Sequence, residues 1–112
     1  YLRAPADNGL FGVQVGHAPA TIEMGIGEIK VSQGTKTMFY STNGGFADVS
    51  PDKVLLLVET IENSQDIDRE RAMNSLKRAK LLLKDSSNNF ERAYLSLHRA
   101  KNRLKLVGKN ST

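Results

Sequence analysis

Hydrophobic and polar positions alternate at short intervals in the first half of the chain. Residues 1–61 hold apolar runs of a few residues, separated by glycine, proline, asparagine and aspartate, which tolerate turn dihedral angles. This pattern is typical of antiparallel strands. It predicts strands at residues 11–15, 21–24, 27–32, 37–41, 45–50 and 53–60, which we expect to pack as a β-sandwich or flattened barrel. Because the run VLLLV at 54–58 is apolar on both faces, we expect the last strand to be central.

From residue 62 onward, apolar positions recur about every 3.6 residues, as in amphipathic helices. One stripe comprises Ala72, Leu76, Ala79 and Leu83, and a second comprises Phe90, Ala93, Leu97, Ala100, Leu104 and Val107. We expect both stripes to be packing surfaces. The short polar connector at 84–89 favours an antiparallel helical hairpin. The sequence therefore predicts an α+β fold in two parts, with a β-sandwich domain at 1–61 and a two-helix hairpin domain at 62–112.

Residues with capping chemistry stand near the predicted helix ends. Ser64 or Asp66 can cap the first helix, and Asn88 with Glu91 makes a capping box for the second. Gly108 suits the end of the second helix because glycine readily adopts the left-handed conformation found there.

Charge is distributed unevenly over the 112 residues. The net charge is +4, but residues 1–61 carry four Lys or Arg against six Asp or Glu, whereas residues 62–112 carry twelve against six. The helical half is therefore the basic one. This asymmetry suggests an anionic partner for it, which could be a nucleic acid, a nucleotide or an acidic protein surface.

Four arginines of the helical half are spaced so that they could meet around a single anion. Arg71 and Arg78 share one helix face, and Arg99 and Arg103 share another. Asp68 lies on the stripe of Arg71 and could orient it. In a hairpin the two pairs could converge, and phosphate is the anion that matches guanidinium geometry. Spacing alone nevertheless favours a solvated basic face, because amphipathic helices routinely expose Lys and Arg.

The sequence lacks the common motifs for catalysis and metal binding. The chain has no cysteine and no glycine-rich phosphate loop, so thiol chemistry, disulfides and the usual route to nucleotide hydrolysis are not supported. His17 and His98 lie far apart and have no carboxylate or second histidine at motif spacing. We therefore predict no catalytic and no metal site, and interpret any bound nucleotide as a signal.

A basic helical hairpin that binds nucleic acid is the chief alternative of another class. Its phosphate contacts would come from the Lys and Arg residues of 62–112. Aromatic side chains that could stack on bases are few there, namely Phe90 and Tyr94. An enzymatic function is the third alternative, because the sequence lacks the common catalytic motifs.

Several motifs, in order along the chain, resemble those of a known family. Residues 12–19 (GVQVGHAP), 43–49 (NGGFADV) and 53–57 (KVLLL) look like the sandwich signatures of the epsilon subunit of the bacterial F-type ATP synthase. Residues 67–72 (IDRERA) are similar to the motif with which bacterial epsilon subunits bind ATP. The resemblance extends from Arg3 to Gly108.

The resemblance implies a regulatory ATP site on the hairpin, with ATP as a ligand and not as a substrate. Ile67 and Ala72 would contact the adenine region, and Glu62 and Asp68 would supply polar contacts. The phosphates would be faced by four arginines, namely Arg71, Arg78, Arg99 and Arg103. The resemblance thus favours the converging arrangement over the solvated basic face.

The resemblance also implies a non-catalytic, central-stalk role. Such subunits couple rotation between the c-ring and the catalytic hexamer, bind the gamma subunit, and lie peripherally at the cytoplasmic face of the bacterial plasma membrane. Their hairpin is compact with ATP bound, and inhibits ATP hydrolysis when it extends towards the alpha and beta subunits. No nucleic-acid partner is implied.

Two departures from the family pattern change these expectations. The family sandwich has two further strands before the segment that matches Tyr1 to Ala4, so we expect unpaired strand edges and a thin core in this chain. In addition, Leu10 stands where many members carry an acidic residue in the loop that faces the c-ring. The contact to the c-ring is therefore expected to differ.

Overall fold

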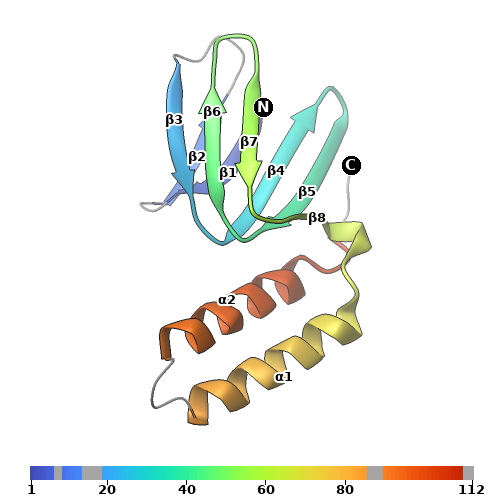
Figure 1. Ribbon diagram of the computed structural model, residues 1–112. Helices are drawn as coiled ribbons and strands as arrows, with labels where there is room; N and C mark the ends of the chain where they lie inside the picture. Colours follow the sequence, from blue (N-terminus) through green and yellow to red (C-terminus); the bar gives the residue numbers. More distant parts are fainter. Residues whose placement is uncertain (7–8, 14–18, 86–89, 110–112) are drawn as a thin grey trace.

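The computed structural model describes residues 1–6, 9–13, 19–85 and 90–109, and it consists of a β-sheet part followed by two helices (Figure 1). The strands are β1 (Leu2–Ala6), β2 (Gly9–Val13), β3 (Ala20–Met24), β4 (Gly27–Gln33), β5 (Lys36–Thr42), β6 (Gly45–Val49), β7 (Val54–Val58) and β8 (Ile61–Asn63). The 3₁₀ helix η1 (Ser64–Asp66) precedes the helices α1 (Arg69–Asp85) and α2 (Phe90–Leu106). The predicted α+β fold, a sandwich followed by an antiparallel hairpin, is confirmed.

The described strands pair antiparallel in the order β7-β6-β3-β1-β4-β5-β8, and β2 pairs with β1. Ala4 of β1, Ile29 of β4 and Ala47 of β6 are fully buried in one cluster. Alternate residues of β7 pack against the same cluster. Tyr40 of β5, near the other end of the strand order, packs against it as well. The sheet therefore folds over itself as a sandwich (Figure 1).

The prediction that the last strand is central was wrong. In the described part of the chain, β7 pairs with β6 alone and ends the strand order. Val54, Leu56 and Val58 are half-buried towards the core, whereas Leu55 and Leu57 on the other face are 51% and 56% exposed. The apolar outer face of this strand therefore lies at an edge of the described sheet.

The first strand has no clear signal in the sequence. Strand β1 (LRAPA) contains Pro5 and lacks alternation, and no strand was predicted there. It nevertheless lies between β3 and β4 in the sheet, and Ala4 is fully buried. The predicted strand at 11–15 corresponds to β2, and residues 14–15 lie outside the described residues.

Small side chains hold the two helices together. Ala72 and Ala79 of α1 and Ala93 and Ala100 of α2 are buried, so the helix backbones approach closely. This confirms the stripes as packing surfaces except at Phe90, which is 60% exposed and stacks on Tyr94. Neither described helix is long and apolar enough to cross a membrane.

Helix capping differs from the expectation at the first helix. The cap of α1 is Asp68, whose Oδ1 accepts a hydrogen bond from the backbone N of Arg71 at 3.0 Å, and not Ser64 or Asp66. The reason is the extended backbone of Ile67 (φ −71°, ψ 123°), which separates η1 from α1. Gly108 has φ +67° and follows α2 as predicted, whereas Asn88 lies outside the described residues.

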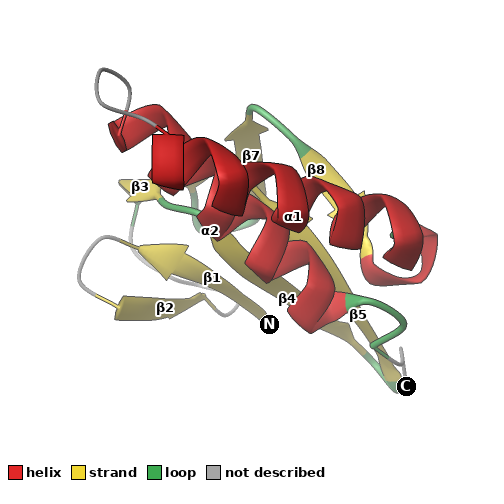
Figure 2. Ribbon diagram, turned by 90° about the horizontal axis from the view of Figure 1, so that it is seen from below, coloured by secondary structure: helices red, strands yellow, loops and turns green. Residues whose placement is uncertain are grey.

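Polar contacts attach the hairpin to one end of the sandwich, with α2 nearer to the sheet (Figures 1 and 2). The Asn102 side-chain amide donates to the carbonyl of Gly27 (2.9 Å) and to Oγ of Ser41 (3.1 Å). Beyond the end of α2, Lys109 Nζ reaches Glu28 Oε2 at 2.6 Å. These contacts fix how α2 faces the sheet and thereby create a space between them.

Candidate functional site

A cavity of about 370 Å³ lies where the hairpin meets the sandwich. Its walls come from α1, from α2 and from the turn between β5 and β6. The residues that line it are Asn43, Ser75, Arg78, Ala79, Leu82, Ser96, Arg99, Ala100 and Arg103. Three segments that are distant in the sequence thus meet at one basic site.

Helical periodicity places these residues. On α1 the lining positions are 75, 78, 79 and 82, and on α2 they are 96, 99, 100 and 103, so both helices follow the spacing i, i+3, i+4, i+7. Each set contains one buried alanine at its centre, Ala79 or Ala100, which leaves room between the helices. Each set also presents serine and arginine three residues apart.

The lining of the cavity is strongly cationic. Among the described residues it contains the arginines Arg78, Arg99 and Arg103 and no Asp or Glu. Arg78 Nη2 donates to Ser75 Oγ at 3.3 Å, but the buried Nε of Arg99 has no hydrogen-bond partner in the described part of the chain. A buried donor without a partner is costly, so Arg99 keeps unused donor capacity in a side chain that lines the cavity.

Glu62 binds the guanidinium group of Arg103. Its two carboxylate oxygens accept from Arg103 Nε (2.9 Å) and Nη2 (3.2 Å), which is a bidentate pair. Both side chains remain about one third exposed, so the pair contributes little stability of its own. It does hold the guanidinium plane of Arg103 in a defined orientation next to the cavity.

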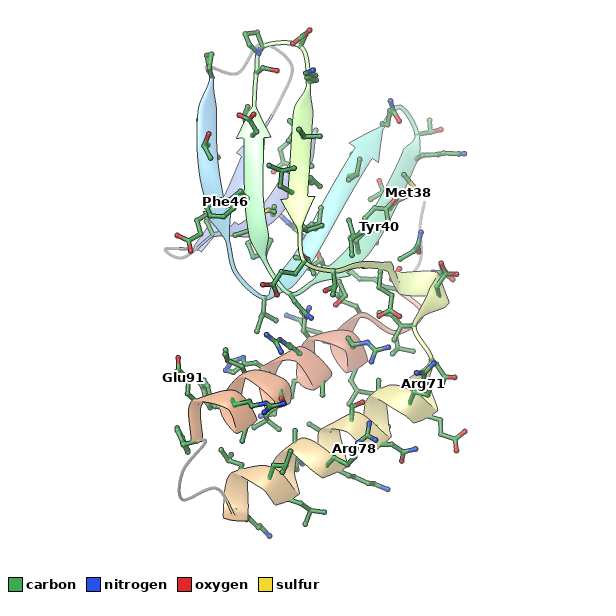
Figure 3. All side chains as sticks on the ribbon, in the orientation of Figure 1. Met38, Tyr40, Phe46, Arg71, Arg78 and Glu91 are labelled. Atoms are coloured by element: carbon green, nitrogen blue, oxygen red, sulfur yellow. The ribbon has the colours of Figure 1, made fainter. Side chains whose placement is uncertain are left out.

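Arg71 lies apart from the other three arginines. It is exposed at the start of α1, whereas Arg78 lies further along the helix (Figure 3). Arg71 does not line the cavity. The structure therefore brings together Arg78, Arg99 and Arg103, with Glu62 bound to the last of them.

The remaining predicted site residues have structural contacts in this arrangement. Ile67 (7% exposed) and Ala72 (0%) are buried in a cluster with Leu106. Asp68 caps α1. These residues join the start of α1 to the end of α2, and none of them lines the cavity.

Three polar lining residues were missed by the sequence reasoning. Ser75 and Ser96 each precede an arginine by three residues, so a helical projection could have found them. Asn43 lies in a turn of the sandwich, and its position beside the helices follows only from the tertiary structure.

Glu28 forms a second charged cluster, on the sandwich side of the attachment. It accepts from Arg3 Nη2 and Lys109 Nζ, both at 2.6 Å, and Lys109 also lies 4.3 Å from the Phe39 ring centroid. Burial by itself raises the pKa of Glu28, but hydrogen bonds and charge interactions with Lys109 and Arg3 outweigh it, so the pKa lies below its usual value. No described group of three or more His, Asp or Glu side chains could hold a metal ion.

Known proteins match both parts of this architecture. Residues 1–64 match the family model described as ATP synthase, Delta/Epsilon chain, beta-sandwich domain. Residues 65–108 match the one described as ATP synthase, Delta/Epsilon chain, long alpha-helix domain. The chain belongs to the ATP synthase delta/epsilon family. The resemblance found in the motifs is thereby confirmed for the whole described fold.

Curated relatives agree with this family and narrow it to epsilon chains. An ATP synthase epsilon chain of Bacillus velezensis is 35% identical over 105 residues, covering 92% of this chain and 80% of the relative. One from Caldicellulosiruptor saccharolyticus is 36% identical over 104 residues, covering 91% and 76%. Within the family, this chain is therefore similar to epsilon chains over most of its length. These relatives are subunits of an enzyme complex, the ATP synthase.

A solved structure supports the fold. A chain in the cryo-EM structure of Euglena gracilis mitochondrial ATP synthase, comprising OSCP, F1 and the c-ring, matches with a TM-score of 0.80 and 20% identity. The match covers 90% of this chain and 65% of that one. At this identity the likeness concerns the fold alone.

Proposed function

We propose that this epsilon-type chain is a non-catalytic subunit of the central stalk of an F-type ATP synthase, and that its hairpin binds ATP as a regulatory ligand. The observation that carries the ATP proposal is the cavity lined by Arg78, Arg99 and Arg103, with no Asp or Glu among its described lining residues. Triphosphate is an anion with enough charge and acceptor oxygens to satisfy three guanidinium groups.

The partners follow from the family. We expect the chain to bind the gamma subunit and the c-ring through its sandwich, and to couple rotation between the c-ring and the catalytic alpha/beta hexamer. In a bacterium it would then lie peripherally at the cytoplasmic face of the plasma membrane. Support comes from the epsilon-chain relatives and from the F1 and c-ring complex that contains the structural relative.

In the proposed mechanism, ATP selects one position of the hairpin. A ligand held by arginines of both helices binds best while those helices are docked on the sandwich, so ATP favours the compact state by its differential affinity. At one hundred times its dissociation constant, such a ligand adds about 2.7 kcal/mol to that state. Falling ATP would release the hairpin to extend and to inhibit ATP hydrolysis.

Some of the proposed site residues already line the cavity, whereas others would contact ATP only after a change in structure. Arg78, Arg99 and Arg103 are poised for phosphate contacts, and Glu62 orients Arg103. Ile67 and Ala72 are buried, so contact with adenine requires that the segment around the start of α1 shifts. Arg71 would join the phosphates, and Asp68 the ligand's polar contacts, only with the same shift.

The test is a calorimetric titration with ATP of the wild type and of Arg99→Ala with Arg103→Ala. Each charge-assisted contact is worth about 1.5 to 3 kcal/mol, so the double change should weaken binding by at least about tenfold. The matched control is Arg92→Ala with Lys101→Ala, which removes the same charge from exposed positions of α2 outside the cavity. An equal loss in both variants would refute a specific site.

The nucleic-acid alternative predicts a different response. A specific ATP site should prefer ATP to GTP at fixed salt, whereas nucleic-acid binding should fall steeply with salt and show little preference for ATP. Filter binding of both nucleotides and of a single-stranded oligonucleotide over a salt series separates the two. Family membership favours the first outcome.

A further inference from the structure

We infer that Asn43, in the β5–β6 turn of the sandwich, donates a hydrogen bond to the phosphates of the ATP that the proposed function places in the cavity, so that the ligand ties hairpin and sandwich together. This inference rests on that proposed function. It adds a contact from a second part of the fold to a site otherwise built from two helices.

The position of Asn43 is the first argument. It lines the same cavity as Arg78, Arg99 and Arg103, and the other lining residues all belong to α1 or α2. Asn43 is partly buried, and its side-chain amide has no hydrogen-bond partner among the residues that the structure describes. A polar group that is half removed from water and unpaired has capacity for a ligand.

The rigidity of the turn is the second argument. The backbone N of Asn43 donates to Thr60 Oγ1 at 3.2 Å, and Thr42 Oγ1 donates to the carbonyl of Thr60 at 2.8 Å. Gly44 follows with φ +115°, and a Cβ there would lie 2.8 Å from the carbonyl oxygen of Met24. The backbone of the turn is therefore fixed against β3 and the β7–β8 connection, which keeps Asn43 beside the cavity that it lines.

The chemistry of the amide is the third argument. The side-chain NH₂ of asparagine offers two donors without adding charge. Among three guanidinium groups a further cation would increase repulsion, and a carboxylate would compete with phosphate for the arginines. A neutral donor at this point suits a phosphate oxygen that the arginines leave unsatisfied.

In this arrangement, ATP would link the helical hairpin to the sandwich. Asn102 already links α2 to the sandwich through Gly27 and Ser41. A phosphate held by Asn43 together with Arg99 would add a link that exists only while ATP is bound. Undocking of the hairpin would then break this link, which makes ATP affinity depend directly on the docked position.

The experiment is calorimetric titration with ATP of two variants at this position. Asn43→Ala should weaken ATP binding by about threefold to tenfold, the worth of one hydrogen bond. Asn43→Asp should weaken it by more than about tenfold, because its carboxylate repels phosphate and pairs with the arginines. Gln33→Glu makes the same change of charge at the exposed end of β4 and should leave affinity unchanged.

Two further measurements use NMR of the wild type and thermal unfolding of Asn43→Ala. The side-chain ¹⁵N–¹H signals of Asn43 should shift on saturation with ATP, while those of Gln33 stay in place. With no ATP, thermal unfolding of Asn43→Ala should match the wild type, since the amide has no described partner to lose. Weakened ATP binding in a variant of unchanged stability supports a direct contact.

The outcomes separate this inference from the proposed function. If Arg99→Ala with Arg103→Ala loses affinity but both Asn43 variants bind as the wild type does, the ligand does not touch the sandwich and this inference fails alone. If the wild type does not bind ATP at all, the proposed function fails and this inference fails with it.

Discussion

The sandwich and the attachment of the hairpin are held by different kinds of interaction. Inside the sandwich, Ile29 and Ala47 are fully buried in an apolar cluster, and strands are joined by continuous antiparallel ladders. Between the sandwich and the hairpin the described contacts include separate polar ones, such as those of Asn102 and Lys109. Apolar core residues are worth several kcal/mol each, whereas single hydrogen bonds are worth about 1 kcal/mol.

This difference suggests a division of labour. The sandwich is a platform whose shape resists small perturbations, and the hairpin is held by interactions of a size that one bound ligand can match. Substitutions on either side of the attachment test that division, and their expected effects decrease from the apolar core of the sandwich to the charges near its surface.

Ile29→Ala should lower the free energy of unfolding by about 2 to 5 kcal/mol, because it leaves a cavity in the fully buried core. Urea denaturation measures this loss. Leu81→Ala, at a position that is 62% exposed on α1, should cost less than about 0.5 kcal/mol. Comparable losses at the two positions would contradict the idea of a sandwich platform.

Asn102→Ala should loosen the hairpin by about 1 to 3 kcal/mol, since two hydrogen bonds to the sandwich are lost. Hydrogen exchange should become faster at amides of α2 while those of β4 keep their protection. Asn74→Ala, on the exposed surface of α1, serves as the control and should change neither. Faster exchange in β4 as well would show that hairpin and platform open as one unit.

Asp68→Ala should cost about 0.5 to 2 kcal/mol because α1 loses its N-terminal cap. Asp68→Asn keeps a capping oxygen and should be nearly as stable as the wild type. Thermal unfolding followed by circular dichroism compares the two. If Asp68→Asn is stable but binds ATP more weakly, the Asp68 charge serves the ligand in addition to the helix.

Glu28→Gln should have the smallest effect, about 1 kcal/mol at neutral pH, and that effect should depend on pH. The pKa of Glu28 is lowered in the folded chain, so its contribution is present above the unfolded value of 4.5 and is lost as the pH falls below it. The difference in unfolding free energy between wild type and variant should therefore shrink below pH 4.5. Glu59→Gln is the exposed control, and a constant difference for Glu28→Gln down to about pH 3 would exclude a role for the Glu28 charge.

Local patterns were sufficient for much of the fold. The alternation in β6 and the 3.6-residue repeat of α1 and α2 each reflect a face that is buried in the final structure. Strand β7 was misplaced because its outer leucines are apolar yet exposed, and a pattern of side chains does not reveal which neighbours are present. Strand β1 was missed because Pro5 and two alanines give no alternation, although pairing with β2 and β4 holds it in the sheet.

Part of the candidate site was predictable from helical periodicity. Arg99 and Arg103 share a helix face in any α-helix, so their convergence with Arg78 needed only an antiparallel hairpin. Arg71 is two turns away from Arg78, and that distance along the axis places it outside the cavity. Asn43 could not be foreseen, because its place depends on how the end of the sandwich meets α2.

Because the lining residues follow the spacing i, i+3, i+4, i+7 on both helices, the cavity is sensitive to rotation of either helix about its own axis. One residue inserted between Asp68 and Ser75 would turn the rest of α1 by about 100° relative to its start while preserving its helical character. Arg78 and Ala79 would leave the shared face together, so α1 would no longer contribute an arginine or a small residue to the cavity. Helix phase, rather than the number of basic residues, therefore decides whether a hairpin of this composition has an anion pocket.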